Sequence, residues 1–187
     1  MLSPNRQACN HHRVVELAPY DPRWPAAFVA EAGRLRAALG SLALRIDHNG
    51  STAVPGLAAK PVIDVQVSVA SLHPLAPYRG RLESIGYVHV PHADDVVCPF
   101  FHRPAKWPHT HHVHVVAAGS EEERRTLAFR DYLRDHAGPR GEYEALKRKL
   151  AGEFTADSDA SREGYASAKS ELVERLIAAA FAAGYPR

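Results

Sequence analysis

Apolar residues recur along this chain with two periods, and the period changes separate expected strands from expected helices. Over residues 61–69 every second residue is apolar, which predicts a β-strand. One face of this strand carries Ile63, Val65, Val67 and Val69, and the other carries Val62, Asp64, Gln66 and Ser68. The strand therefore has one face for a core and one face for chemistry.

A helical period comes before this strand. Phe28, Ala32, Leu35 and Leu39 recur at three- and four-residue spacing, which predicts an amphipathic helix ended by Gly40. Asp21-Pro22 offers a capping carboxylate and a proline for the start of that helix.

Similar patterns predict the remaining elements. Further strands are expected at 42–47, 87–90, 96–102 and 111–117, and further helices at 75–85, 120–136, 140–152 and 161–183. Ser120 and Glu123 form a capping box at the start of the 120–136 helix, and Gly138-Pro139 is expected to stop it. Mixed strands and helices followed by a helical tail predict an α+β fold, a mixed β-sheet packed against helices.

Composition narrows the class of protein. A chain of 187 residues with 45% hydrophobic and 24% charged residues is long enough for one domain with a real core, expected over 14–187 after a disordered leader at 1–13. The formal net charge of +2 is too small to argue for a nucleic-acid partner. Without a membrane-length apolar run or a signal-peptide pattern, we expect a cytoplasmic protein. Cys9 and Cys98 do not make a disulfide framework.

Phosphate chemistry is suggested by Gly50-Ser51, which follows one apolar run and leads into the strand that carries Asp64. Small residues allow backbone N–H groups and a hydroxyl to close around a phosphate. The alternative is a tight turn that needs only its glycine. Lys60, between this loop and the strand, is a further candidate phosphate contact.

A carboxylate inside a strand of Val and Ile, such as that of Asp64, is costly unless it binds a cation or hydrogen-bond donors. His112 and His114 leave the same face of the 111–117 strand and can complete a nitrogen–oxygen metal site with Asp64, together with His48. Such ligands suit Zn, Mn or another transition metal better than Mg. Seven of the twelve histidines fall within residues 89–114, and His109 and His111 are additional candidates. The alternative is that these histidines line a pocket or a wet strand face.

Basic residues of the helical tail are candidate ligands for an anion. Tyr143/Lys147 and Tyr165/Lys169 each share a helix face at i, i+4, so a ring can stack on a base while the ammonium holds its phosphate. Arg130 offers a fork of donors to the same anion. Alternatively the rings pack the helices onto the sheet and the lysine stems extend to solvent.

The segment from His48 to Val67 resembles the signature of the GrpB family, which has a nucleotidyltransferase-like fold. Further matching segments are Tyr20–Pro25, Gly86-Tyr87, His112–His114, Phe129–Leu133, Tyr143–Lys147, and Tyr165 with Lys169. The resemblance implies that Gly50 and Ser51 hold phosphate and that Asp64 holds a cation. Active nucleotidyltransferases generally carry a second acid two residues on, where this chain has Gln66, and a third on a neighbouring strand, where it has His112 and His114.

These residues and the resemblance to the GrpB family are compatible with three functions. The first is transfer of a nucleotidyl group to a small acceptor, with a divalent metal bound by Asp64. The second is a catalytically reduced accessory or sensor domain that binds a nucleotide or phosphorylated metabolite; GrpB-like domains also occur fused to dephospho-coenzyme A kinase. The third is a histidine-dependent metalloenzyme on the same scaffold. We expect one open sheet face to carry Asp64, Gln66, His112 and His114, backed by the 28–39 helix and the C-terminal helices.

Overall fold

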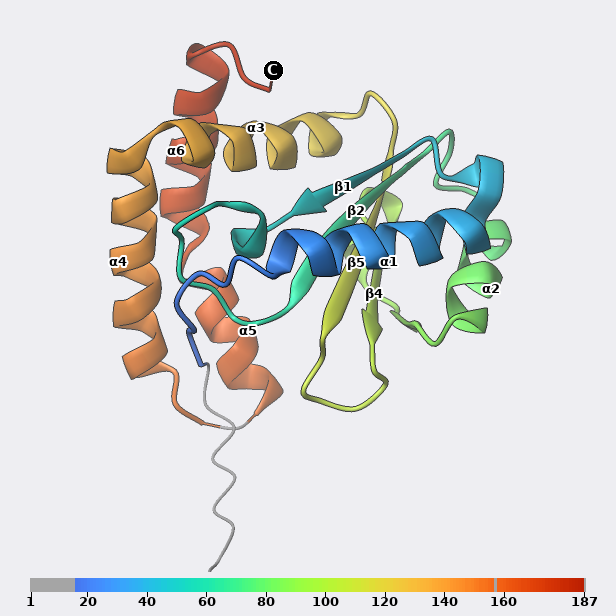
Figure 1. The fold of residues 1–187 in the computed structure, drawn as a ribbon, viewed down its shortest axis with the longest axis horizontal. Coiled ribbons are helices and arrows are strands. Elements are labelled where there is room, and N and C mark those ends of the chain that lie inside the picture. Colours follow the sequence, from blue (N-terminus) through green and yellow to red (C-terminus); the bar gives the residue numbers. More distant parts are fainter. Residues whose placement is uncertain (1–15, 157, 187) are drawn as a thin grey trace, which may run out of the picture.

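The structure of this chain, a computed structural model, describes residues 16–156 and 158–186. The expected leader at 1–13, with Cys9, lies outside these residues. The five strands are β1 (Arg45–Asn49), β2 (Ile63–Val69), β3 (Val88–Val90), β4 (Phe100–Arg103) and β5 (His111–Ala117). They form one sheet in the order β1-β2-β5-β4-β3 (Figure 1). The pairing of β2 with β5 is parallel and the other pairings are antiparallel, so the sheet is mixed, as the sequence predicts.

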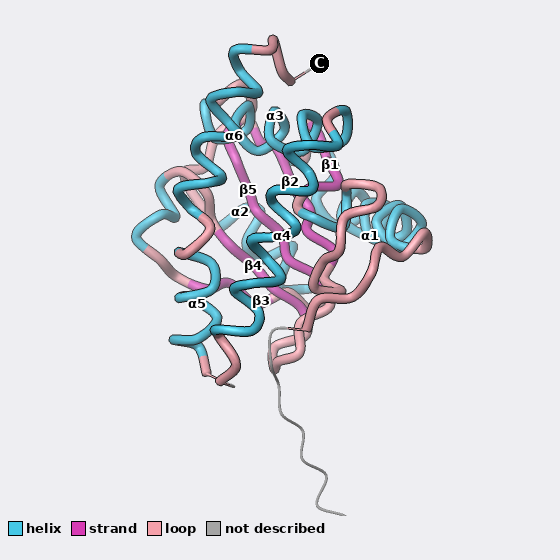
Figure 2. Tube along the Cα trace, turned by 90° about the vertical axis from the view of Figure 1, so that its left-hand side faces the viewer, coloured by secondary structure: helices cyan, strands magenta, loops and turns pink. Residues whose placement is uncertain are grey.

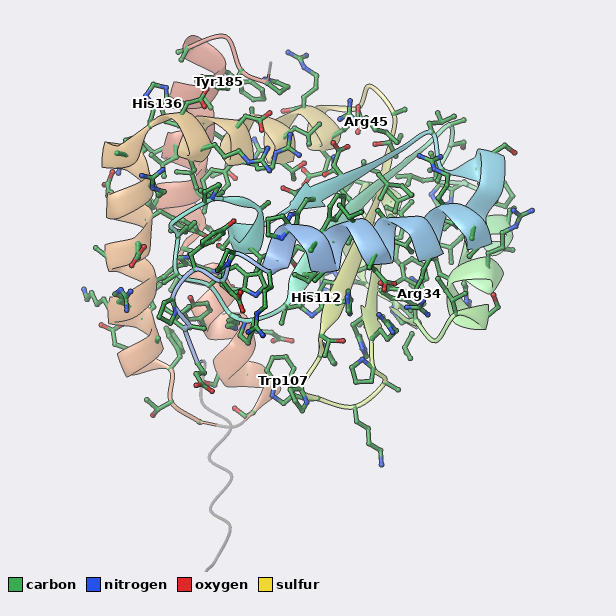
Figure 3. All side chains as sticks on the ribbon, viewed as in Figure 1. Arg34, Arg45, Trp107, His112, His136 and Tyr185 are labelled. Carbon is green, nitrogen blue, oxygen red and sulfur yellow. The ribbon has the colours of Figure 1, made fainter. Side chains whose placement is uncertain are left out.

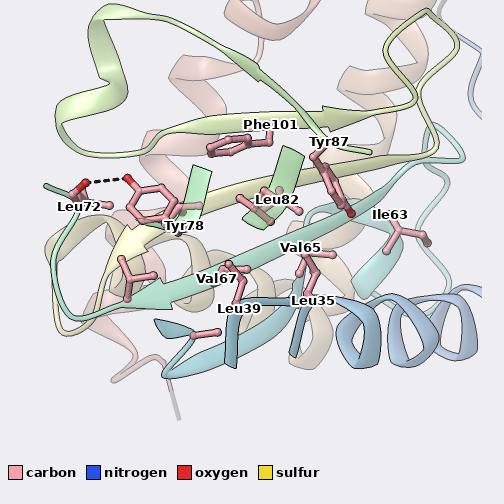
Figure 4. Close-up of a cluster of buried hydrophobic side chains, with 14 of the residues drawn as sticks. Leu35, Leu39, Ile63, Val65, Val67, Leu72, Tyr78, Leu82, Tyr87 and Phe101 are labelled. Carbon is pink, nitrogen blue, oxygen red and sulfur yellow. Dashed lines mark hydrogen bonds between the residues drawn. The ribbon is translucent and has the colours of Figure 1, made fainter. Parts of the chain in front are cut away.

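One face of the sheet packs against α1 (Trp24–Leu39) and α2 (Ala76–Ser84). The apolar face of β2 meets Leu35 and Leu39 of α1, and these side chains have no exposed surface (Figure 4). Burying a side chain of this size contributes about 1.5–3 kcal/mol. The period-two pattern of β2 and the helical period of α1 therefore meet in one hydrophobic core.

The opposite face of the sheet is polar. The C-terminal helices are expected behind this face, but they lie on it. These helices are α3 (Glu121–Asp135), α4 (Ala137–Glu153), α5 (Asp159–Ser167) and α6 (Ser170–Ala182). The Ser68 hydroxyl donates to the Glu123 carboxylate, and the Thr126 hydroxyl donates to Gln66 Oε1, so α3 rests on the polar face of β2. In Figure 2 the strands run between α1 on one side and α5 and α6 on the other. The expected open face is therefore partly closed.

Several expected boundaries are wrong, for reasons of local backbone chemistry. The first helix begins at Trp24 with Pro25 in its first turn, and Asp21 instead accepts a hydrogen bond from the amide of Arg23. Gly138-Pro139 lies in the first turn of α4, where a proline is tolerated because its missing N–H would have no helical partner. The expected 161–183 helix is two helices that break at 168–169.

The edge strands also differ from expectation. A 3-10 turn at Gly40–Leu42 delays the start of β1 to Arg45, and another at Ala93–Val96 shortens the expected 96–102 strand to β4. The strand at 111–117 and the Ser120 cap are confirmed, the Ser120 side chain accepting from the amide of Glu123. No helix in the described ranges has both the length and the apolar character that a membrane crossing needs.

A buried carboxylate ties α1 to the sheet. Glu31 lies on the apolar face of α1 and is 3% exposed. Its carboxylate accepts from the Tyr87 hydroxyl at 2.9 Å and pairs with Arg103 at 2.7 Å and Arg34 at 2.9 Å. A buried carboxylate with this many donors is compensated, but removing it leaves the Arg103 guanidinium without its carboxylate partner.

We expect Glu31→Ala to lower the free energy of unfolding by about 2–4 kcal/mol, because a buried carboxylate and its donors lose each other. Glu83→Ala is the matched control, since its exposed pair with Arg79 contributes less than about 1 kcal/mol. Urea denaturation of both variants measures the difference. Equal losses in the two variants would contradict the role assigned to Glu31.

Candidate functional site

Asp64, His112 and His114 meet on the polar face because β2 and β5 are parallel neighbours. The register places Asp64 beside His112 and Gln66 beside His114. Asp64 Oδ1 lies 3.3 Å from His112 Nδ1 and 3.9 Å from His114 Nε2. One oxygen and two nitrogens of the three side chains lie within 4.8 Å of one another, with His112 on the strand near the middle of Figure 3. One carboxylate and two imidazoles form a ligand set that suits a transition metal with further positions open.

The charge states of these side chains match the needs of a metal site. Burial opposes ionisation of Asp64, but the hydrogen bond from His112 and the positive charges of His112, His114 and Lys169 outweigh it and lower the pKa of this carboxyl. Burial lowers the pKa of His114, against the opposing charge of Asp64. Near neutral pH the Asp64 carboxylate is therefore ionised and the His114 imidazole is neutral. These are the forms of the two side chains that bind a metal.

Side chains from β4 and its flanks support the two histidines. His109 Nδ1 lies 3.2 Å from His112 Nε2, and the rings of His102 and His109 stack with centroids 3.8 Å apart. Cys98 Sγ lies 3.8 Å from His114 Nδ1. In both His112 and His114 the ring nitrogen that faces away from Asp64 contacts another side chain, and such a contact fixes the orientation of a metal-binding imidazole.

Sequence reasoning names His109 as a candidate ligand, but it contacts the site through His112. The contribution of Phe100, His102 and Cys98 is not predicted. The register of β4 against β5, which sets Phe100 beside His114 and His102 beside His112, is the missing information. The rings of Phe100 and His114 lie 5.1 Å apart, so an apolar wall stands beside the polar group.

Gly50 must be a glycine because of Asp64. Its φ is +64°, in the left-handed region that side chains disfavour. A Cβ at this position would lie 2.2 Å from Asp64 Oδ2. The loop backbone therefore sits directly against the carboxylate, which allows a ligand to touch both.

A cavity of about 420 Å³ begins at this loop and carries three lysines. Its lining includes Ser51, Thr52, Lys60, Asp64, Phe100, Trp107, His109, His112, Lys147, Tyr165 and Lys169. Lys147 Nζ donates to the Ser51 hydroxyl at 3.1 Å and also to the carbonyl of Ala58. The Nζ atoms of Lys60 and Lys169 each lie 4.4 Å from the centroid of the Tyr165 ring. The ammonium groups of Lys60, Lys147 and Lys169 therefore converge on one space. Lys60 precedes β2, Lys147 lies in α4, and Lys169 lies just before α6.

Burial and repulsion by a neighbouring lysine destabilise the charged forms of Lys147 and Lys169. Burial, with the charge of Lys169, lowers the pKa of Lys147 to about 7. Burial and the charge of Lys60 lower the pKa of Lys169 to about 8. The alternative in which the tyrosine rings pack and the lysine stems reach solvent holds only for the rings. Tyr143 and Tyr165 are buried, but Lys147 is only 2% exposed and its stem does not extend to solvent. Crowded, desolvated cations of this kind are stabilised by an anionic ligand.

Two residues named from the sequence do not join the site. His48 pairs with Val65, so it points to the core face, where it stacks on Phe28 with ring centroids 4.7 Å apart. The structure does not bring His48 into the group with Asp64, His112 and His114, because the antiparallel register of β1 places Asn49 rather than His48 beside Asp64.

Arg130 is also held away from the cavity. Its Nε donates to Asp131 at 2.7 Å and its Nη1 to the backbone oxygen of His48 at 3.0 Å, so it links α3 to β1. His111 lies 3.1 Å from Arg103 in the Glu31 network, on the far face from Asp64.

Comparison with solved structures agrees with this architecture. The structure of GrpB from Enterococcus faecalis has a TM-score of 0.77 and 31% identity, covering 88% of this chain and 96% of that one. The Cid1 poly(U) polymerase in complex with MgATP has a TM-score of 0.51 at 14% identity, covering 75% of this chain and 46% of that one. At that identity the second likeness shows the fold alone, which is nucleotidyltransferase-like.

Sequence relatives agree with the structural match. The UPF0157 protein BH1888 of Halalkalibacterium halodurans is 40% identical over 168 residues, covering 89% of this chain and 83% of the relative. A dephospho-CoA kinase of Mycolicibacterium paratuberculosis is 35% identical over 170 residues, covering 78% of this chain but only 42% of that protein. The family model described as GrpB protein matches residues 14–179. This chain therefore belongs to the GrpB family, with a nucleotidyltransferase-like fold.

Proposed function

We propose that this chain binds a nucleotide or another phosphorylated small molecule in the lysine-lined cavity, beside a divalent metal held by Asp64, His112 and His114. The observation that carries this proposal is that Asp64 and His112 belong both to the ligand group and to the cavity lining. A metal on these side chains would lie at the wall of a space lined by three lysines. Phosphate oxygens bridging metal and ammonium groups would be neutralised from both sides.

The ligand types favour Zn or Mn over Mg. Mg²⁺ prefers oxygen ligands in octahedral geometry, whereas imidazole nitrogens suit transition metals. Gln66 does not supply the missing oxygen, because its Oε1 already accepts from Asn49 and Thr126. Asp64 is therefore the single carboxylate of the three-residue group, where a triphosphate with two Mg²⁺ needs several.

This shortage of carboxylates supports a binding role with weak or absent nucleotidyl transfer. The dephospho-CoA kinase relative, in which the matched region is less than half of the protein, is consistent with an accessory domain for a phosphorylated metabolite. Transfer to a small acceptor is the second candidate, and it is supported by the fold that this chain shares with a polymerase solved with MgATP.

The metal is tested with Asp64→Asn and His114→Ala, both expected to lower Zn²⁺ or Mn²⁺ affinity by at least about 100-fold. Loss of a ligand should exceed the 10- to 100-fold cost of losing a group that only orients one. His92→Ala is the control, since this histidine is 66% exposed and pairs with Asp94. Calorimetric titration and metal analysis of the purified chains report the result. Mg²⁺-dependent pyrophosphate release from ATP that survives His114→Ala would instead restore the transferase.

Phosphate binding is tested through its pH dependence. Lys147 and Lys169, with pKa values of about 7 and 8, must be protonated to pair with an anion. Their protons are lost as the pH rises, so affinity for tripolyphosphate and ATP should fall by about tenfold or more between pH 7 and pH 9.

A lysine variant assigns this effect to the cavity. Lys147→Met preserves the buried stem, and we expect it to weaken tripolyphosphate binding and flatten the pH dependence. Lys149→Met removes a 72% exposed lysine from the same helix and should match the wild type. Calorimetry at both pH values is the measurement. Affinity that is independent of pH and of Lys147 would exclude this cavity as the phosphate site.

A further inference from the structure

A second cavity, of about 390 Å³, adjoins Asp64 from a different set of elements. Its lining is Asn49, Gly50, Asp64, Gln66, Cys98, His114, Glu122, Arg125, Thr126, Phe129, Val173, Glu174 and Ile177. Asp64 lines both cavities, while Ser51 borders the first and Gly50 borders the second. Its volume falls within the range of about 300–1,000 Å³ typical of small-molecule sites.

A buried amide in this lining lacks a partner. The Gln66 side chain has no exposed surface, and its Oε1 accepts from Asn49 Nδ2 at 3.2 Å and Thr126 Oγ1 at 2.5 Å. Its Nε2 finds no acceptor within the described residues. An unmet buried donor costs about 1–3 kcal/mol, and a ligand oxygen in the cavity would remove that cost.

The charge of this cavity is opposite to that of the lysine cavity. Asp64, Glu122 and Glu174 face a single cation, Arg125. Arg125 pairs closely with Glu174 at 2.5 Å but lies 3.8 Å from Glu122. Burial raises the pKa of Glu122, as expected for a carboxylate whose charge is incompletely compensated. Without a metal these four charged groups sum to −2, and a divalent cation on Asp64 would neutralise that sum without giving Glu122 a close cationic partner.

We propose that this second cavity binds a small hydroxylated amine, whose oxygen accepts from Gln66 Nε2 and whose ammonium pairs with Glu122. Phe129, Val173 and Ile177 provide an apolar wall for its carbon skeleton. The binding itself rests on the second cavity alone; its meaning as a co-ligand beside a phosphate rests on the proposed function. The two ligands would then approach Asp64 from different cavities, one lined by lysines and the other by Glu122 and Glu174.

Glucosamine, glucose and gluconate are the probes, because they share a polyol skeleton and differ in charge. We expect glucosamine to shift backbone amide resonances of residues 122–126 and 173–177 and to bind at least about tenfold more tightly than glucose. Glu122→Gln should bring glucosamine to within about twofold of glucose. Glu121→Gln, which removes an exposed neighbouring acid outside this lining, should not. Titrations of the isotope-labelled full chain followed by NMR give the affinities and the location.

The proposal is overturned if gluconate binds as tightly as glucosamine, if the shifts map elsewhere, or if no probe saturates. Gln66→Met tests the amide and should weaken glucosamine and glucose alike. If that variant does not fold, because Gln66 also bonds to Asn49 and Thr126, the Glu122 comparison still decides.

Tripolyphosphate added to the same samples separates the two proposals. Lys147→Met should lose the tripolyphosphate response and keep the glucosamine response, and Glu122→Gln should do the reverse. A wild-type chain that responds to glucosamine but not to tripolyphosphate would contradict the phosphate site alone. A wild-type chain that responds to tripolyphosphate but not to glucosamine would contradict the amine site alone.

Discussion

The parallel pairing of β2 with β5 is the constraint on which the candidate site depends. Side chains alternate across a strand, so the pairing must align residues of like kind: Asp64 beside His112, Val65 beside Val113, Gln66 beside His114. A slip of one residue would drive carboxylate and imidazoles into the core and expose the valines. Four valines on the buried face have no exposed surface, so the hydrophobic core itself enforces the register of the polar group; they are Val65, Val67, Val113 and Val115.

The sequence predicts those parts of the fold whose cause is local. The alternation of 61–69 and 111–117 identifies the central strands and their polar faces, and the Ser120 cap marks the start of α3. It also predicts that Asp64 and His112 share a face, which the structure confirms. Their binding roles remain predictions, because proximity alone does not establish a ligand.

What the sequence does not predict depends on non-local pairing. The antiparallel register of β1 decides that Asn49, not His48, joins Asp64, and nothing near His48 in the chain reveals this. Arg130 is likewise held away from the cavity by its hydrogen bond to the backbone oxygen of His48, 82 residues away in the chain. Glu31 stands at a core position of α1, and its partners Tyr87 and Arg103 lie more than fifty residues away. Such contacts depend on strand order, which a single sequence does not determine.

Among the described residues, the buried polar groups around Glu31 and those around Asp64 differ in how far they are compensated. The negative charge of Glu31 is compensated by Tyr87, Arg34 and Arg103, so this carboxylate stabilises the fold and needs no ligand. The groups around Asp64 are compensated only in part. Lys147 and Lys169 have neutral partners but are desolvated cations with lowered pKa values, and Gln66 Nε2 has no acceptor among the described residues. Unfavourable terms of this kind persist where binding relieves them, which is why we assign function to this face.

The contact between His112 and Asp64 connects the apo state to the metal-bound state. With a proton on His112 Nδ1, the imidazole donates to the carboxylate and its Nε2 accepts from His109 Nδ1. Asp64 and His112 would hold a metal through Oδ1 and Nδ1 only in the other tautomer of His112, in which its Nε2–H donates and His109 Nδ1 accepts. The His109 contact is compatible with both tautomers, so it can hold the ring still while the proton moves. This tautomer change conserves the number of protons on the two imidazoles. Metal binding would weaken as the pH falls because Asp64 and His114 must be deprotonated to act as ligands, whereas anion binding by the lysines would weaken as the pH rises. Joint occupancy of the metal and phosphate sites would then be greatest in a window near neutral pH.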